Sequence, residues 1–142
     1  MNRLPSLAGV VLDWAGTIID HGSRAPTRVF HEVFHARGVA VSDEQIRRFM
    51  GRSKREHLEE ICRIPQVAAD WIRVHGHPAR ESDIDSMYRE FVPLQESVIV
   101  QHTDVIPGVL EALSALRQRG LRIGSTTGYP RSVMNVLLPA AA

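Results

Sequence analysis

Near its amino end the chain reads LAGVVLDWAGT (residues 7–17), an unbroken apolar run that stops at Asp13. Unbroken rather than alternating apolarity predicts a strand buried on both faces, as in a parallel sheet. The residues after Asp13 then form a loop at the carboxyl end of this strand, where open α/β sheets bind their ligands. A second strand and loop, LRIGSTTGYP (residues 121–130), follow a helical pattern at residues 109–120. Together these stretches predict a βαβ unit.

The segment between the two strands has the pattern of several helices, from about residue 24 to residue 101. Its helix-start signals are Pro26 and Pro65 in first turns, and the capping pairs Ser42 with Gln45, Ser53 with Glu56 and, more loosely, Ser82 with Asp85. Pro93 interrupts an apolar stripe and is expected to kink or break its helix. We therefore predict an α/β protein with an incomplete parallel-sheet core at residues 1–21 and 103–142, and an inserted all-helical module at residues 22–102.

Length and composition limit the class of protein. The chain has 142 residues, 44% hydrophobic and 23% charged, which suits a globular domain or a small core that carries an insertion. Its formal net charge of +1 does not favour binding to nucleic acid or to a membrane surface. Its single cysteine, Cys62, excludes an internal disulfide. Neither a long apolar run nor a signal-peptide pattern is seen, so we expect a cytoplasmic protein.

The two strand ends provide the first candidates for chemistry. A carboxylate such as Asp13 at the end of a buried strand can act as a nucleophile or as a metal ligand. The alternative is a turn aspartate that caps its loop. After the second strand, residues 125–128 (Ser-Thr-Thr-Gly) offer hydroxyl and backbone N–H groups just before a helix, which suits a phosphate. An ordinary loop between a strand and a helix is the alternative there.

Lys54 is the third candidate, because it lies in the predicted first turn of a helix capped by Ser53. The positive end of the helix dipole, with Arg52 and Arg55 nearby, is expected to lower the pKa of the Lys54 ammonium group. A neutral amine can attack a carbonyl carbon and form a Schiff base, and His57 lies within reach for proton transfer. The alternative is a solvated lysine in a basic turn.

These residues resemble a known enzyme superfamily. The sequence DWAGT (residues 13–17) resembles motif I of the haloacid dehalogenase (HAD) superfamily, whose first aspartate is the nucleophile, and residues 125–128 resemble its motif II. The helical module resembles a cap inserted after the first strand. Most phosphatases of the superfamily have a second aspartate where this chain has Ala15. The combination of Ala15 and Lys54 resembles the one found in the phosphonoacetaldehyde hydrolases, or phosphonatases.

The resemblance implies a HAD-like fold and a hydrolase that cleaves the carbon–phosphorus bond of phosphonoacetaldehyde, releasing acetaldehyde and phosphate. The roles that it implies are Asp13 as nucleophile, Lys54 as Schiff-base amine, Met50 and His57 as helpers of the imine steps, Thr127, Gly128 and Tyr129 as the substrate- and phosphate-binding loop, and Mg²⁺ held by the Asp13 carboxylate and the Ala15 backbone carbonyl. It also implies a homodimer formed through the caps.

The loss of an aspartate at position 15 and the presence of Lys54 explain each other. A phosphatase needs an acid to protonate its oxygen leaving group, whereas a phosphonate has a carbon leaving group that protonation alone does not make acceptable. An imine at Lys54 can accept the electrons of the breaking bond instead. The resemblance runs to the last residues, before the superfamily's basic motif III and acidic motif IV. We therefore expect a truncated portion with an exposed sheet edge and an uncovered apolar face, and with impaired activity unless a partner completes the core.

Two other functions remain open from the sequence. The chain can belong to another phosphatase or mutase of the same superfamily, although Ala15 argues against it because the general acid is absent. It can also be a non-catalytic interaction fragment that works through its helical cap. Replacement of Lys54 by arginine separates the first alternative from a Schiff-base enzyme, because a phosphatase should tolerate it.

Overall fold

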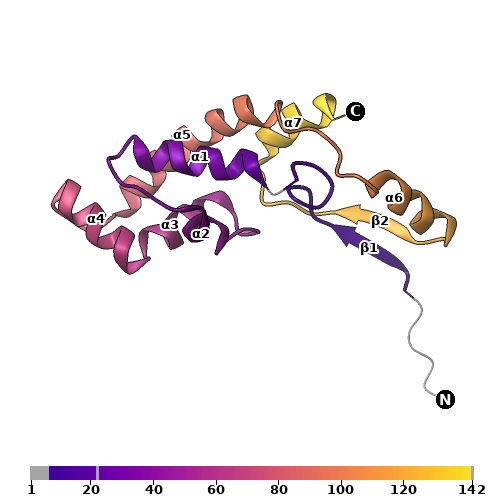
Figure 1. Cartoon of the computed structure of the whole chain (residues 1–142), viewed down its shortest axis with the longest axis horizontal. Coiled ribbons are helices and arrows are strands. Elements are labelled where there is room, and N and C mark those ends of the chain that lie inside the picture. Colours follow the sequence, from indigo (N-terminus) through magenta and orange to yellow (C-terminus); the bar gives the residue numbers. More distant parts are fainter. Residues whose placement is uncertain (1–6, 22, 142) are drawn as a thin grey trace, which may run out of the picture.

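The computed structural model describes residues 7–21 and 23–141, which form an elongated molecule with helices at one end and a small sheet at the other (Figure 1). In chain order the elements are β1 (Gly9–Leu12), α1 (Arg24–His35), α2 (Asp43–Arg47), α3 (Lys54–Cys62), α4 (Pro65–His75), α5 (Glu81–Ile99), α6 (Val109–Gln118), β2 (Arg122–Ser125) and α7 (Arg131–Ala140). The predicted order of strand, helical segment, helix and strand is confirmed. No helix in these described ranges is long and apolar enough to cross a membrane.

The two strands pair in parallel, as predicted. Gly9 lies opposite Arg122 and Leu12 lies opposite Ser125. The pairing continues for one more residue, because the Thr126 N–H donates to the Leu12 carbonyl at 2.9 Å. Both strands therefore end at the same edge of the sheet, and the loops that follow them start side by side.

The prediction that the first strand is buried on both faces is wrong for the described part of the chain. Val11 is 69% exposed, and α6, which packs against β2, has no buried side chain. A parallel strand is buried on both faces only where further elements cover the sheet, and the described residues add no further strand to these two. The expected uncovered apolar face of the sheet is confirmed by the exposure of Val11, and Leu110 of the neighbouring α6 is also 65% exposed.

Most of the predicted helix starts are confirmed. Ser42 and Gln45 form a full reciprocal capping box before α2, and α4 begins at Pro65. The capping pair expected at Ser82 and Asp85 is wrong, because α5 begins at Glu81 and the Asp83 carboxylate accepts the Arg80 N–H at 2.8 Å.

Pro93, which we expected to kink or break its helix, does not break it. Helix α5 continues through Pro93 as far as Ile99, and Phe91 and Gln95 on either side of it are fully buried. Burial of an amphipathic face stabilises a helix by more than a single lost backbone hydrogen bond costs.

The hydrophobic core lies among the helices and reaches across to α7. Helix α5 packs along α1, α3 and α7, and Figure 1 shows α7 beside the carboxyl end of α5. The largest fully buried side chains include Trp71, Phe30, Phe34 and Phe91, and Val133 and Leu137 of α7 belong to the same cluster. Because α7 directly follows the loop after β2, this packing holds that loop against the helices.

Two segments carry the chain between the sheet and the helices, and they pair with each other. Ile19 forms isolated bridges with Ala15 and Val105, and the Ile106 N–H donates to the Ile18 carbonyl at 2.9 Å. Asp20 follows in a left-handed conformation with φ 52°. Its carboxylate accepts the backbone N–H groups of Arg24 and Ala25 at 2.9 and 3.0 Å, which caps α1.

Candidate active site

A small cavity of about 40 Å³ lies where the two strand ends meet the helices. Its lining residues are Asp13 and Ala15 after β1, Ser23 and Pro26 at the start of α1, Met50, Gly51 and Lys54 around the start of α3, and Thr127, Gly128 and Tyr129 after β2. A more open hollow of about 270 Å³ shares Asp13, Gly51, Thr127 and Gly128 with it. The carboxylate, the amine and the hydroxyl loop predicted from separate stretches are thus brought to one place.

Asp13 is held by the loop that follows it. The Trp14 N–H donates to one carboxylate oxygen, Oδ1, at 2.8 Å. No other side-chain hydrogen bond to Asp13 is found among the described residues, so the second oxygen can meet a ligand in the cavity. A positioned carboxylate with one oxygen open is suited to attack an electrophile or to bind a metal ion.

Lys54 is the first residue of α3 and is buried, with 5% of its surface exposed. This burial excludes the alternative of a solvated lysine. Burial lowers the pKa of the Lys54 ammonium from 10.5 to about 8, and the negative charge of Asp13 opposes the shift. The predicted lowering is therefore confirmed, and a useful fraction of the amine is neutral near physiological pH.

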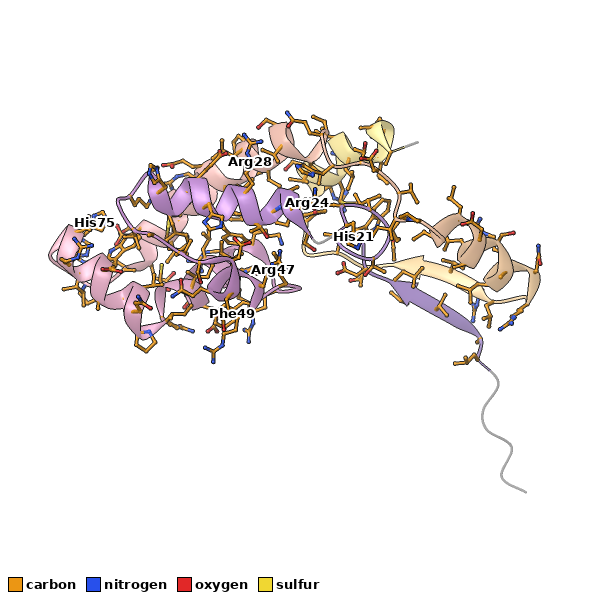
Figure 2. The ribbon with its side chains drawn as sticks, in the orientation of Figure 1. His21, Arg24, Arg28, Arg47, Phe49 and His75 are labelled. Carbon is orange, nitrogen blue, oxygen red and sulfur yellow. The ribbon has the colours of Figure 1, made fainter. Side chains whose placement is uncertain are left out.

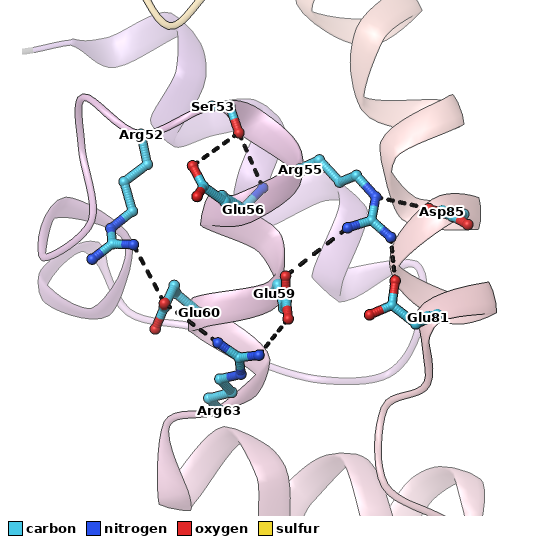
Figure 3. A network of polar contacts seen from close by, with 9 residues as sticks. All are labelled: Arg52, Ser53, Arg55, Glu56, Glu59, Glu60, Arg63, Glu81 and Asp85. Atoms are coloured by element: carbon cyan, nitrogen blue, oxygen red, sulfur yellow. Dashed lines mark hydrogen bonds and ion pairs between the residues drawn. The ribbon is translucent and has the colours of Figure 1, made fainter.

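The neighbouring arginines, which we expected to contribute to this shift together with the helix dipole, are paired with acidic residues instead. Figure 3 shows Arg55 of α3 reaching Glu81 and Asp85 of α5, the latter at 2.9 Å. Arg52 lies 3.4 Å from Glu60 in the same network. Paired guanidinium groups exert little net field on an amine nearby, so burial rather than like charge lowers the pKa of Lys54. The network joins α3, which carries Lys54, to α5.

Tyr129 covers the amine from the side of the sheet. The Lys54 Nζ lies 5.4 Å from the centre of the Tyr129 ring, a distance at which an ammonium is attracted by the ring. Burial raises the pKa of the Tyr129 hydroxyl, and the charges of Asp20 and Asp13 raise it further. The hydroxyl therefore keeps its proton, and it is a buried donor that has no partner among the described residues.

His57 lies behind the cavity and does not line it. Its ring packs on Phe30 at 4.1 Å, and its Nε2 lies 2.7 Å from the Ile46 carbonyl. A carbonyl oxygen only accepts, so Nε2 carries the proton and the buried Nδ1 is the basic nitrogen, with no partner in the described chain. Burial lowers the pKa of His57 to about 4, which keeps the ring neutral. Met50, by contrast, lines the cavity.

Gly128 allows the loop after β2 to touch the segment before α3. A Cβ at this position would lie 2.8 Å from the Arg52 carbonyl oxygen, closer than real side chains come. The absence of a side chain at Gly128 thus brings the hydroxyl loop next to the helix that carries Lys54. This contact closes the cavity between the sheet and the helices.

Several lining residues were not predicted from the sequence. Pro26 was interpreted only as a helix-start signal, and Ser23, with an unusual φ of 52°, gave no signal. Composition contains one signal that would have singled out Lys54. It is the only lysine of the chain, and all the other basic residues counted with it are arginines. A lone lysine among arginines suggests a requirement for an amine, because a guanidinium does not deprotonate in proteins.

Only part of a metal site is formed by the described residues. Asp13 and the backbone of Ala15 offer oxygen ligands at one edge of the cavity, but no group of three or more His, Cys, Asp or Glu side chains able to hold a metal is found in residues 7–21 and 23–141. Oxygen is the ligand that Mg²⁺ prefers, and it takes six. The donor type fits this ion, with the remaining positions left to water, substrate or other groups.

The parallel strands with a helical insertion, and the carboxylate and hydroxyl loop at the strand ends, define a hydrolase of the haloacid dehalogenase type. The model of the haloacid dehalogenase-like hydrolase family matches residues 7–142, and the chain belongs to that family.

Within this family, the chain is similar to proteins named as phosphonoacetaldehyde hydrolases. The chain is 49% identical over 132 residues to a phosphonoacetaldehyde hydrolase-like protein of Syntrophobacter fumaroxidans, covering 93% of this chain and 48% of that protein. It is 46% identical to the phosphonoacetaldehyde hydrolase of Aeromonas hydrophila, covering 94% of this chain and 48% of that enzyme. The chain thus spans about half the length of the curated relatives it matches.

Solved structures agree with the fold. The crystal structure of a phosphonoacetaldehyde hydrolase-like protein from Oleispira antarctica matches with a TM-score of 0.86 and 33% identity, over 99% of this chain and 53% of that one. A β-phosphoglucomutase from Clostridium difficile matches with a TM-score of 0.73 over 95% of this chain and 57% of that one, at 18% identity. The latter likeness concerns the fold alone.

Proposed function

We propose that the chain carries the aldehyde- and phosphonate-binding part of a phosphonoacetaldehyde hydrolase. The observation that supports this most is the burial of its only lysine, Lys54, in the same cavity as Asp13 and the Thr127-Gly128 loop. A phosphate-ester hydrolase has no need of a buried neutral amine, whereas an enzyme that captures a carbonyl substrate as an imine does. The names of the relatives point to the same substrate.

The first proposed step is the capture of the aldehyde. The neutral Lys54 Nζ attacks the carbonyl carbon of phosphonoacetaldehyde, and loss of water with uptake of one proton from solvent leaves an imine whose nitrogen is protonated. The lowered pKa of Lys54 supports this step because it supplies neutral amine. Met50, on the wall of the cavity, and the neutral His57 behind it are proposed to assist the imine steps.

The second proposed step is cleavage of the carbon–phosphorus bond. A carboxylate oxygen of Asp13 attacks phosphorus, and the electron pair of the breaking bond moves into the iminium group, which becomes an enamine. Protonation of the enamine carbon and hydrolysis of the imine release acetaldehyde and the free amine. Water then cleaves the aspartyl phosphate to give phosphate and restores Asp13. The overall reaction consumes one water and needs no oxidant or reductant.

The other lining residues are proposed to orient the substrate. The hydroxyl and N–H groups of Thr127 and Gly128 would bind the phosphonate oxygens, and Tyr129 would close the site over Lys54. The Asp13 carboxylate and the Ala15 carbonyl would hold Mg²⁺. A bound magnesium ion supplies positive charge that offsets the charge of the phosphonate oxygens.

The proposed cap, residues 22–102, is also a candidate for self-association into a homodimer. Ile72 of α4 is 45% exposed and offers an apolar side chain for such a contact. Light scattering over a range of protein concentrations tests it. A monomeric mass at all concentrations contradicts the proposal.

Borohydride trapping tests the proposed function. The protein is mixed with phosphonoacetaldehyde and reduced, and its intact mass is measured. Because Lys54 is the only lysine, a reduced adduct can form only there or at the terminal amine. We expect an adduct whose proteolytic peptide contains Lys54, and none in Lys54→Arg, which keeps the positive charge. An adduct at the terminal amine alone, in a folded chain, contradicts the proposal.

A further inference from the structure

Arg55, the residue after Lys54, joins the start of α3 to α5. Its Nε lies 2.9 Å from a carboxylate oxygen of Asp85, and another of its nitrogens contacts the carboxylate of Glu81 (Figure 3). These carboxylates lie 30 and 26 residues further along the chain. A planar guanidinium that meets two carboxylates fixes direction as well as distance. This contact, the Arg55 fork, therefore ties the first turn of α3 to the start of α5.

Lys54 depends on its helix for its place in the cavity. Its ammonium group makes no hydrogen bond to another described residue, and the ring of Tyr129 is 5.4 Å from its Nζ. The hydroxyl of Ser53 accepts the Glu56 N–H and caps the first turn of α3. Both residues belong to the same segment, so this bond does not fix α3 against α5. The burial of Lys54 thus depends on contacts between the helices.

We propose that Arg55 is a positioning residue for the candidate active site: the Arg55 fork holds the first turn of α3 in place and so keeps the Lys54 amine buried in the cavity. Arg55 does not line the cavity, so it acts through the position of Lys54. The consequence for aldehyde capture rests on the proposed function, whereas the burial of the amine does not.

Another arginine close to Lys54 provides the control for charge. Arg52 comes two residues before Lys54 and pairs with Glu60 of α3. Its guanidinium carbon lies 6.0 Å from the centre of the Phe49 ring, which Figure 2 shows at the helical end of the molecule. Arg52 thus carries the same charge as Arg55 but makes no ion pair with α5 in the described structure. The variant Arg52→Gln therefore removes a nearby positive charge and leaves the fork intact.

The first readout needs no aldehyde. A pH titration of protein labelled with ¹³C-lysine measures the pKa of Lys54, the only lysine of the chain. In Arg55→Gln we expect water to reach the amine and the midpoint to rise by about half a pH unit from about 8. The double variant Glu81→Gln/Asp85→Asn breaks the same fork and should also raise the midpoint, although the loss of negative charge by itself would lower it.

The two fork variants together separate positioning from a direct effect of charge. An unchanged midpoint in Arg55→Gln, or a lowered midpoint in the double variant, overturns the proposal. Arg52→Gln should keep the wild-type midpoint, and a rise equal to that of Arg55→Gln would assign the effect to charge and overturn the proposal as well. Each titration is run below the melting temperature of its variant, so that folded protein is measured.

The second readout is the rate at which borohydride traps phosphonoacetaldehyde at Lys54. A rise of about half a unit in the pKa lowers the neutral fraction of the amine at pH 7 about threefold. Arg55→Gln and the double variant should therefore form the adduct about threefold more slowly than the wild type and Arg52→Gln. Equal rates in Arg55→Gln and the wild type contradict this consequence. If the wild type forms no Lys54 adduct, the proposed function fails, while the titration still decides the role of Arg55.

Discussion

Replacing Asp13 by asparagine should lower the pKa of Lys54 below its value of about 8. Burial drives the pKa down from 10.5, and the negative charge of Asp13 opposes this, so its removal leaves burial unopposed. At pH 7 a pKa of about 8 leaves about a tenth of the amine neutral, roughly three hundred times more than an ordinary lysine. The Asp13→Asn change can therefore raise the neutral fraction at pH 7 by at most about tenfold.

A pH titration of the labelled lysine measures this directly. The chain has one lysine, so a ¹³C-lysine sample gives one Cε resonance, whose shift against pH reports the pKa of Lys54 without assignment. Asp104→Asn is the matched control, since Asp104 contributes nothing to the shift of Lys54. A wild-type midpoint near 10.5 would refute burial of the amine. A midpoint that rises in Asp13→Asn would refute the assigned sign of the Asp13 charge.

Three further predictions follow from burial and packing. Lys54→Met should raise the free energy of unfolding by up to about 3 kcal/mol at pH 7, because the pKa of Lys54 is about 8 in the folded state and 10.5 in the unfolded state, and burial of the ammonium therefore destabilises the fold fully below pH 8 and not above 10.5. Urea unfolding at pH 7 and at pH 10.5 measures this effect, and an equal effect at both pH values contradicts the prediction. Because the pKa of His57 falls from 6.5 to about 4 on folding, the unfolded chain binds a proton at a higher pH than the folded chain does. The free energy of unfolding of the wild type should therefore fall by up to about 3 kcal/mol as the pH falls from 6.5 to 4, and urea unfolding of His57→Gln should not show this dependence on pH. Gly128→Ala places a methyl group 2.8 Å from the Arg52 carbonyl oxygen and should slow adduct formation at Lys54, whereas in Gly124→Ala the nearest atom is 3.8 Å away and trapping should continue at the wild-type rate.

The sequence predicted those features that depend on short-range patterns. The strands ending at Leu12 and Ser125, the capping box at Ser42 and the first-turn Pro65 are set by residues within one turn or strand of each other. The meeting of Asp13 with Thr127 followed from parallel pairing, since the carboxyl ends of parallel strands share one edge.

Features that depend on long-range packing could not be predicted in this way. Local pattern predicted a lowered pKa for Lys54 but assigned it to the helix dipole and to Arg52 and Arg55, because burial of the amine and the pairing of these arginines with α5 and with Glu60 are invisible in sequence. Pro93 was expected to kink or break a helix that core packing keeps unbroken. The position of Ser23 on the cavity wall could not be predicted either, because it depends on a left-handed backbone conformation next to the start of α1, which Asp20 caps.

The presence of a single lysine in these 142 residues also means that their surface carries no other side-chain amine. Every other basic side chain counted with it is an arginine, and a guanidinium that never loses its proton does not form an imine with an aldehyde as an amine does. Under the proposed function, free aldehyde in solution therefore meets no competing side-chain amine in these 142 residues. In this stretch, apart from the terminal amino group, the proposed capture and any amine-directed aldehyde damage are confined to the same atom, Lys54 Nζ. A stretch of this composition offers an aldehyde no pair of lysine side chains to cross-link.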